Sequence, residues 1–243
     1  SRKSKLIMKN AHVKLTADKI KRRKKRYKVA KLILLVVILL LALAYTVFAF
    51  IYNGYNFTIS LDKNLYYDNK VIIYDSSDYK VYRQQIKVDS LEYFDNISEK
   101  WLPKDLDDYE GSHNGENYLA YSFYIENQGI DPVDFWAELI IEDVIKGLDE
   151  AIRFKIYYDG VATTYAKESD KGTPEKGTTK FHDEDTVMLQ HVENFEPGQI
   201  HKYTIVMWLE GTDPECTDNI LGGEIRAYMT FNSHNKDGGR VNE

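Results

Sequence analysis

The chain has 243 residues, and its formal net charge of −6 is unevenly distributed. Residues 1–31 contain 14 Lys and Arg against one acid, Asp18, a balance of +13, whereas residues 53–243 contain 18 basic and 37 acidic side chains, a balance of −19. This asymmetry argues against an ordinary acidic soluble protein, and the single cysteine, Cys216, excludes an intramolecular disulfide.

The first predicted element is a basic arm, residues 1–31. Eight of its cations lie next to the following apolar segment and are expected at the membrane interface: Lys21, Arg22, Arg23, Lys24, Lys25, Arg26, Lys28 and Lys31. A cluster of this kind marks the cytoplasmic side of a spanning helix and can also contact anionic lipid headgroups. We expect no nucleic-acid binding, because Tyr27 alone among Phe, Trp and Tyr could stack on bases. Residues 10–28 lack Pro and Gly and are predicted to continue the helix.

A transmembrane helix is predicted over residues 32–52. The run LILLVVILLLALAYTVFAFI, from Leu32 to Ile51, has no charged residue, and as a helix it would span roughly 30 Å, the thickness of a bilayer core. Tyr45, Tyr52 and Tyr55 are expected at the outer interface, so the chain is predicted to be a single-pass protein of the cell membrane with its N-terminus in the cytoplasm.

A cleaved signal peptide is the main alternative to this anchor. Ala42-Leu43-Ala44 has the small-x-small pattern that precedes a cleavage site. The apolar run is longer than the usual 7–15-residue core of a signal peptide, and bulky residues continue to Ile51. The anchor is therefore the preferred interpretation, with cleavage after Ala44 as its rival.

Residues 53–232 are predicted to form one extracytoplasmic β-domain. In 117–127, Leu119, Tyr121, Phe123 and Ile125 share one face of a strand, and in 133–144 Phe135, Ala137, Leu139 and Ile141 do the same. Further strands are expected in 55–61, 70–74, 152–160, 161–166, 186–192, 203–210 and 224–231. The fold class is therefore mainly β, an antiparallel β-sandwich of the jelly-roll or immunoglobulin-like kind.

The segments between these strands have their own signals. Asp159-Gly160 predicts a tight hairpin, and the polar stretch 166–186 predicts a mobile loop. A short helical turn within 88–106 is expected to pack Leu91, Phe94, Ile97 and Trp101 against the sheet. Residues 233–243 are predicted to form a disordered tail.

A search for catalytic or metal-binding spacing finds no site. No second His lies three to five residues from any outer histidine: His113, His182, His191, His201 and His234. The acids around Cys216 are expected to raise its pKa instead of activating it. Carboxylates in DLDDYEGSHNGEN offer a calcium candidate, Asp105, Asp107, Asp108 and Glu110, although the spacing is not that of an EF-hand and a solvated turn is the preferred interpretation. No enzyme activity and no cofactor is predicted.

The segments ENYLAYSFYIENQG, FEPGQIHKYTIVMWLE and MWLEGTDPECTDNILGGEIRAYMTF together resemble exported β-sandwich proteins of low-GC Gram-positive bacteria, including relatives of the TasA and camelysin biofilm-fibre proteins. The resemblance covers most of residues 55–232 and implies a sandwich fold and surface assembly. The chain differs from such fibre proteins in its long basic arm and long apolar run. No functional residue is transferred from the family.

The leading hypothesis is a membrane-anchored cell-surface protein with a structural or interaction role. Export without disulfides fits a bacterial envelope. The expected partners are the lipid bilayer and other envelope or surface proteins, with self-association as a further option. One alternative is a leader-cleaved subunit that polymerises into a fibre or matrix. A second is an extracellular enzyme or sensor whose site is assembled from distant residues.

Overall fold

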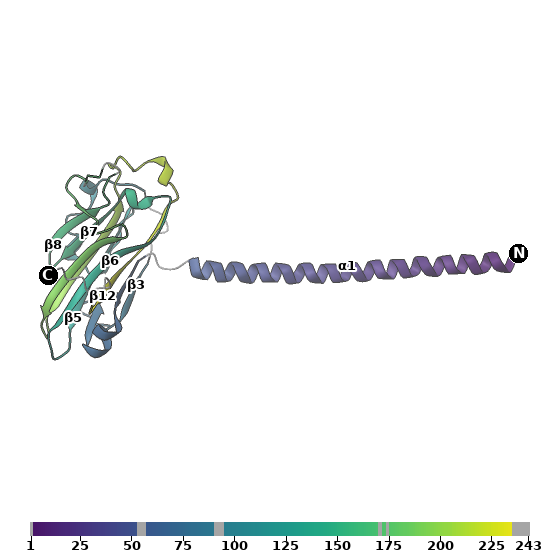
Figure 1. Cartoon of the computed structure of the whole chain (residues 1–243), viewed down its shortest axis with the longest axis horizontal. Helices are drawn as coiled ribbons and strands as arrows, with labels where there is room; N and C mark the ends of the chain where they lie inside the picture. Colours follow the sequence, from purple (N-terminus) through teal and green to yellow (C-terminus); the bar gives the residue numbers. More distant parts are fainter. Residues whose placement is uncertain (1, 53–56, 90–94, 170–171, 174, 235–243) are drawn as a thin grey trace. The chain divides into compact units, whose positions relative to one another are not determined.

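The chain folds into two compact units, Ser1–Gly54 and Tyr55–Glu243, which we call the helical unit and the β-domain. The computed structural model describes residues 2–52, 57–89, 95–169, 172–173 and 175–234, with side chains described for all of these except 2–18 and 48–52. Figure 1 shows the long helix of the first unit and the layered strands of the second.

The helical unit is one helix, α1 (Arg2–Tyr52). Its continuity follows from the absence of Pro and Gly, the two residues that most strongly interrupt helices, and the predicted extension of the helix through residues 10–28 is confirmed. Within α1, Lys19–Val47 is long and apolar enough to cross a membrane. Among the described residues, none covers its apolar side chains: Leu32 and Leu41 are each 64% exposed.

The β-domain contains twelve strands in the described residues. Their bounds are β1 (Phe57–Leu61), β2 (Val71–Tyr74), β3 (Gln85–Val88), β4 (Gly111–Ser112), β5 (Tyr118–Asn127), β6 (Val133–Ile145), β7 (Ile152–Tyr158), β8 (Val161–Ala166), β9 (Thr179–Lys180), β10 (Thr186–Phe195), β11 (Ile200–Leu209) and β12 (Glu224–Asn232). Single helical turns lie between them: η1 (Asn64–Asp68), η2 (Glu99–Trp101), η3 (Leu106–Asp108), η4 (Leu148–Glu150) and η5 (Asp218–Ile220).

These strands form two sheets that pack as a sandwich (Figure 1). Sheet A has the order β10-β6-β12-β1-β3, and sheet B has the order β2-β5-β11-β7-β8-β9, with β4 also paired to β5. The predicted sandwich is confirmed, but it is mixed instead of purely antiparallel. The pairs β1–β12 and β8–β9 are parallel, which is possible because long stretches of chain separate the partners.

The core lies between the sheets and follows the predicted alternation. Leu119, Phe123 and Ile125 on β5 are buried, as are the inward side chains of β6. Phe123 lies 5.9 Å from Phe231 and 5.6 Å from Tyr203, measured between ring centroids. Aromatic packing therefore holds β5, β11 and β12 together across the two layers.

The predicted hairpin at Asp159-Gly160 is confirmed. Tyr158 pairs with Val161 across a two-residue turn, and Asp159 and Gly160 have φ values of 48° and 83°. Positive φ at both positions is the requirement of a type I′ turn, which Asp and Gly satisfy at low cost.

Three loop predictions need correction. Strand β3 was not anticipated. A helical turn does form at η2, but Trp101 is 77% exposed, because the next residue, Leu102, takes the buried position. Leu91 and Phe94 lie outside the described residues. The segment 166–186 contains β9 and the buried Phe181, so its last part belongs to the sheet.

Candidate ligand-binding groove

The site lies on the outer face of sheet B, opposite the core. Pairing registers place its outward side chains in rows that run across β5, β11, β7 and β8. From one end of the strands to the other, these rows are Ser122, Thr204, Tyr157 and Ala162; then Ala120, Val206, Lys155 and Thr164; then Tyr118, Trp208, Arg153 and Ala166. In the second and third rows, the large apolar side chains Val206 and Trp208 on β11 lie next to the basic side chains Lys155 and Arg153 on β7.

Residues 95–110, which we call the strap, cover the β5–β11 part of this face. Leu102 and Leu106 of the strap pack in a small cluster with Ala120, Val206 and Trp208. Leu106 is 1% exposed and Trp208 is fully buried. This second core explains how an outward face of a sheet can carry large apolar side chains.

Hydrogen bonds join the strap to β11 along its length. Ile97 N donates to Leu209 O at 2.9 Å, and Gly211 N donates to Ile97 O at 3.0 Å. Further along, Thr204 Oγ1 donates to Asp107 Oδ1 at 2.6 Å. The strap is therefore attached by its backbone at one end and by a partly exposed carboxylate at the other.

The carboxylate of Glu210, at the end of β11, connects three parts of this region. Its Oε2 accepts hydrogen bonds from Trp208 Nε1 at 3.0 Å and Glu99 N at 2.9 Å, and its Oε1 accepts from Thr212 N and Oγ1. Burial alone would raise the pKa of Glu210, but these donors hold it below its ordinary value. Glu210 thus stays ionised and ties the strap to the sheet.

Between the strap and the outer part of sheet B lies a groove of about 360 Å³. It is lined by strap residues and by two side chains of β7: Glu99, Lys100, Leu102, Pro103, Lys104, Leu106, Lys155 and Tyr157. Leu102 and Leu106 supply its apolar lining, and Tyr157 supplies a half-buried ring. Burial raises the pKa of Tyr157, so its hydroxyl stays neutral and can donate or accept a hydrogen bond.

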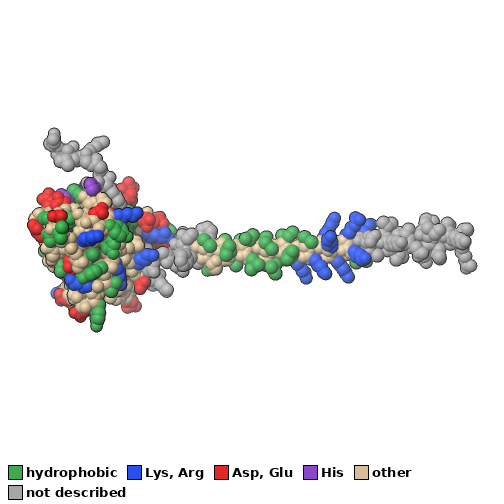
Figure 2. Space-filling view, turned by 90° about the horizontal axis from the view of Figure 1, so that it is seen from below, with side chains coloured by type: hydrophobic (Ala, Val, Ile, Leu, Met, Phe, Trp, Pro, Cys, Tyr) green, Lys and Arg blue, Asp and Glu red, His purple; other side chains and the backbone are tan. Residues whose placement is uncertain are grey.

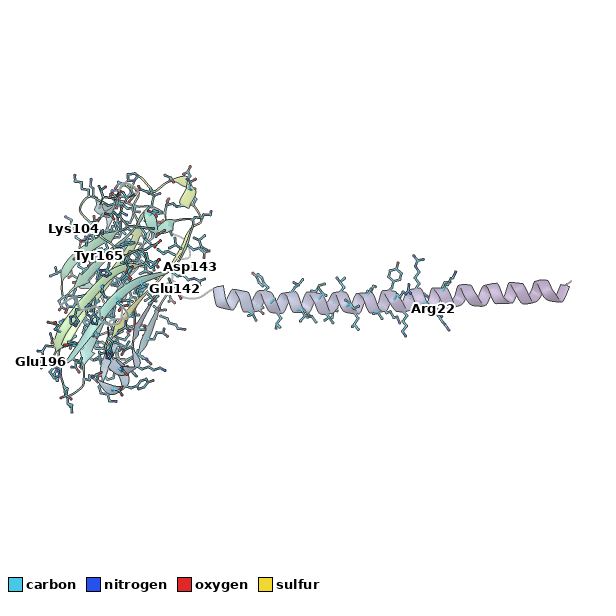
Figure 3. The ribbon with its side chains drawn as sticks, in the orientation of Figure 1. Arg22, Lys104, Glu142, Asp143, Tyr165 and Glu196 are labelled. Atoms are coloured by element: carbon cyan, nitrogen blue, oxygen red, sulfur yellow. The ribbon has the colours of Figure 1, made fainter. Side chains whose placement is uncertain are left out.

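The groove is positively charged. Three Lys and one Glu line it, and Lys155 Nζ lies 3.1 Å from Glu99 Oε1. Lys100 and Lys104 are exposed and have no ion-pair partner among the described residues. Figure 3 labels Lys104 at the margin of the β-domain. In a region whose balance is −19, this concentration of unpaired cations distinguishes the groove.

Beyond the groove, an ion-pair cluster covers Arg153 in the third row of this face. Arg153 and Asp213 form a buried pair, with side chains 4% and 0% exposed, and Glu175 lies 4.0 Å from the guanidinium. Oxygen atoms of Glu175, Asp213 and Glu215 lie within 4.8 Å of one another. Arg153 lies within this cluster and is paired with the buried Asp213, an arrangement typical of a structural ion pair.

The structure does not bring the calcium candidates together. The Asp107 carboxylate accepts from Thr204 Oγ1 and lies 3.8 Å from Lys202 Nζ, Asp105 accepts from Tyr109 Oη at 3.0 Å, and Glu110 accepts from Tyr124 Oη at 2.7 Å. Asp108 is exposed. These carboxylates face different partners, and the spacing could not show this for Asp107, because its partners lie on the distant strand β11.

Other predicted residues are placed as follows. The cations from Lys21 to Lys31 and Tyr45 lie exposed on α1, with Tyr45 75% exposed. The side chain of Tyr52 and all of Tyr55 lie outside the described residues. Cys216 packs partly buried against the core, and burial followed by Asp213 and Glu210 raises its pKa, which confirms the direction predicted.

Sequence reasoning missed the groove. Lys100, Lys104 and Lys155 belong to two segments, and only the strap brings them together. One signal was available: EKWLPK places two Lys beside a Trp and a Pro, a composition unusual for a helical turn that packs on a sheet.

Comparisons with known proteins add no family. No family model and no curated protein sequence matches the chain. Among solved structures, the chain shows a likeness to the beta-glucosidase of Kluyveromyces marxianus in complex with glucose, with 13% identity and a TM-score of 0.22. The match covers 65% of this chain and 15% of that enzyme. A likeness at this level carries no argument about fold or function.

Proposed function

We propose that this chain is a single-pass membrane protein that keeps its basic arm in the cytoplasm and displays the β-domain outside the cell as an interaction module. The observation that carries the proposal is the uncovered apolar surface of α1. Leu32, Leu41 and Leu43 are all more than 60% exposed, and a bilayer is the solvent in which such a surface is stable.

Charge supports the orientation. Figure 2 shows Lys and Arg side chains gathered on one stretch of α1 and hydrophobic side chains on the next. Arg22, labelled in Figure 3, belongs to the basic stretch. Spanning helices retain such clusters on the cytoplasmic side, so the acidic β-domain is assigned to the opposite side.

An interaction role fits the chemistry of the β-domain better than catalysis. The buried ionisable groups described above are engaged in holding the fold: Glu210 anchors the strap, and Asp213 pairs with Arg153. His201, which is 8% exposed, contacts Asp159 Oδ2 through Nδ1 at 2.6 Å and stacks on Phe195. The groove, in contrast, presents unpaired cations beside apolar and aromatic surface, the combination expected of a binding site.

The fibre-subunit alternative would need cleavage after Ala44 and a sheet edge suited to polymerisation. Strand β10 lies at one edge of sheet A, and its register with β6 shifts between Thr186 and Met188 and again between Val192 and Phe195. Irregularities of this kind protect a sheet edge from adding further strands. This argument applies to the β10 edge alone; we favour the anchored display protein because the apolar surface of α1 is exposed, and the resemblance to biofilm-fibre proteins stays a prediction.

Cysteine labelling of intact cells tests the topology. In a Cys216→Ser background, Lys19→Cys marks the arm and Glu184→Cys marks the β-domain; both native residues are exposed. A membrane-impermeant maleimide should label Glu184→Cys on intact cells and Lys19→Cys only after permeabilisation. The reverse pattern would refute the orientation, and a cell-free product that begins at Tyr45 would refute the anchor.

A further inference from the structure

An open sheet edge lies one strand away from the β7 side chains that line the groove. Strand β8 pairs with β7 along its whole length but with β9 only at Tyr165 and Ala166. The outer edge of residues 161–164 therefore has no strand partner among the described residues. Val161 is 71% exposed, and the segment VATT contains none of the charges or prolines that usually protect an edge.

The backbone of this edge is oriented for pairing. Phe181 N donates to Ala166 O at 3.1 Å from the β9 side, so the peptide group of Ala166 faces outward. Because outward and inward peptide groups alternate along an antiparallel pair, Ala162 and Thr164 face outward as well. Their side chains lie in the same rows as Tyr157 and Lys155.

One cation of the groove lies a single strand inward of this edge. Lys155 is directly opposite Thr164 in the β7–β8 register, and Thr164 Oγ1 donates to Glu99 Oε1 of the strap at 3.3 Å. Lys100 and Lys104 line the same groove from the strap. A strand added to β8 would lie about 4.8 Å beyond it. Its side chains in the row of Thr164 would point to the same face as Lys155, whose Nζ lies near Thr164 because both contact Glu99 Oε1.

We propose that the groove binds an extended acidic segment of a partner polypeptide, which pairs with β8 through its backbone and with Lys100, Lys104 and Lys155 through its carboxylates. The inference rests on the proposed role as a displayed interaction module and names its partner chemistry. The open backbone edge specifies a polypeptide, since a glycan has no alternating amide ladder. The lysines specify acidic side chains.

A photo-crosslinking experiment on the full chain tests this proposal. The chain is placed in phosphatidylcholine nanodiscs and mixed with a ten-residue peptide of alternating Thr and Glu that carries a central benzophenone. Mass spectrometry then maps the attachment sites. We expect crosslinks within 99–106 and 155–164, and any crosslinks to the basic arm are counted separately and serve as an internal reference.

Two variants separate the contribution of the lysines from that of the β8 backbone edge. Lys100→Gln with Lys104→Gln should reduce groove crosslinks about fivefold or more while arm crosslinks stay constant. Ala162→Pro removes an outward N–H at an edge position where Pro is tolerated and should reduce them by a similar factor. The matched control, Lys63→Gln with Lys70→Gln, removes two exposed cations outside the groove and should change nothing. Circular dichroism verifies that each variant is folded.

Each other result would overturn the proposal. Groove crosslinks that survive the lysine changes, or that form equally with a Thr-Gln peptide, exclude carboxylate recognition. Lysine dependence without an effect of Ala162→Pro, together with stronger competition by an anionic polysaccharide, assigns the groove to glycans. If crosslinks between two copies of the chain form in place of crosslinks to the peptide, the groove is assigned to self-association. If the peptide crosslinks only to the basic arm, a binding site in the groove is excluded. Nanodiscs expose both membrane sides, so none of these results depends on topology.

Discussion

Two parts of the outer face of sheet B carry similar basic residues, but the residue is buried in one part and partly exposed in the other. Arg153 and Lys155 lie two residues apart on β7, with side chains on the same face. Arg153 is 4% exposed and paired with a fully buried Asp213, whereas Lys155 is 23% exposed and paired with a half-exposed Glu99. Their positions on the strand do not explain this difference in exposure. What lies over each residue decides whether the charge holds the fold together or remains available to a ligand.

The part of this face that lies under other segments of the chain, which we call the covered part, is packed like a protein core. Trp208 is fully buried, Leu106 is nearly so, and Glu210 accepts four hydrogen bonds from the surrounding chain. The open part retains unpaired lysines and an unpaired strand edge. Substitutions should therefore change folding stability in the covered part and binding in the open part.

The largest effect is expected at the buried ion pair. Arg153→Met leaves the buried Asp213 carboxylate without its counter-charge and should lower the free energy of unfolding by about 3–5 kcal/mol. Urea unfolding followed by Trp fluorescence measures the change. The double variant Arg153→Met with Asp213→Leu should recover at least half of the loss, because an apolar pair needs no charge compensation.

Lys155→Met is the matched control on the same strand. Its ion pair with Glu99 is partly exposed, so the cost should stay below about 1 kcal/mol. Equal losses for Arg153→Met and Lys155→Met would contradict the distinction between a covered and an open part.

The strap provides the next test. Leu106→Ala should cost about 2–4 kcal/mol, because it empties a position that is 1% exposed in the second core. Trp101→Ala, in the same strap but 77% exposed, should change stability by no more than about 0.5 kcal/mol. If Trp101→Ala proved the more destabilising, the strap would pack differently from the arrangement described.

Glu210 should make stability depend on pH. Its pKa is lower in the folded chain than in the unfolded chain, so its contribution is present above the ordinary Glu pKa and is lost as pH falls through the lowered value. Glu210→Gln should cost about 1–2 kcal/mol at pH 7, and its stability should fall less than that of the unmodified chain between pH 6 and pH 3. Glu224→Gln, at an exposed position of β12, should preserve the original pH dependence.

Much of the fold could be predicted because its signals are local. Alternation in 117–127 and 133–144 gives the inward faces of β5 and β6, and Asp159-Gly160 gives the hairpin. The charge-free run from Leu32 gives a helix suited to a bilayer. The decisive property is the two-residue period for the strands, the backbone dihedral angles for the turn and the length of the apolar run for the helix. Each of these is encoded by residues that are close together in the sequence.

The outer face of sheet B could not be predicted, because its character depends on the segments that cover it, the strap and the loop that carries Asp213. Nothing local in IRFKIYY indicates that Arg153 is buried and Lys155 is not. Trp101 was expected to pack and is exposed, because Leu102 occupies the site beside Val206. Asp105 to Glu110 suggested a shared metal site, but the partners of Asp107, Thr204 and Lys202, lie on a strand far along the chain.

The smallest expected effect on stability concerns the lysines that we assign to ligand binding. Lys100→Gln with Lys104→Gln should shift the free energy of unfolding by less than about 0.5 kcal/mol, since both side chains are exposed and neither has an ion-pair partner among the described residues. The same urea titration used for Arg153→Met checks this. A loss above 2 kcal/mol would mean that these cations hold the strap, and any loss of crosslinking in that variant would then report unfolding. A neutral result, combined with a fivefold loss of groove crosslinks, would separate binding from folding on one face of one sheet.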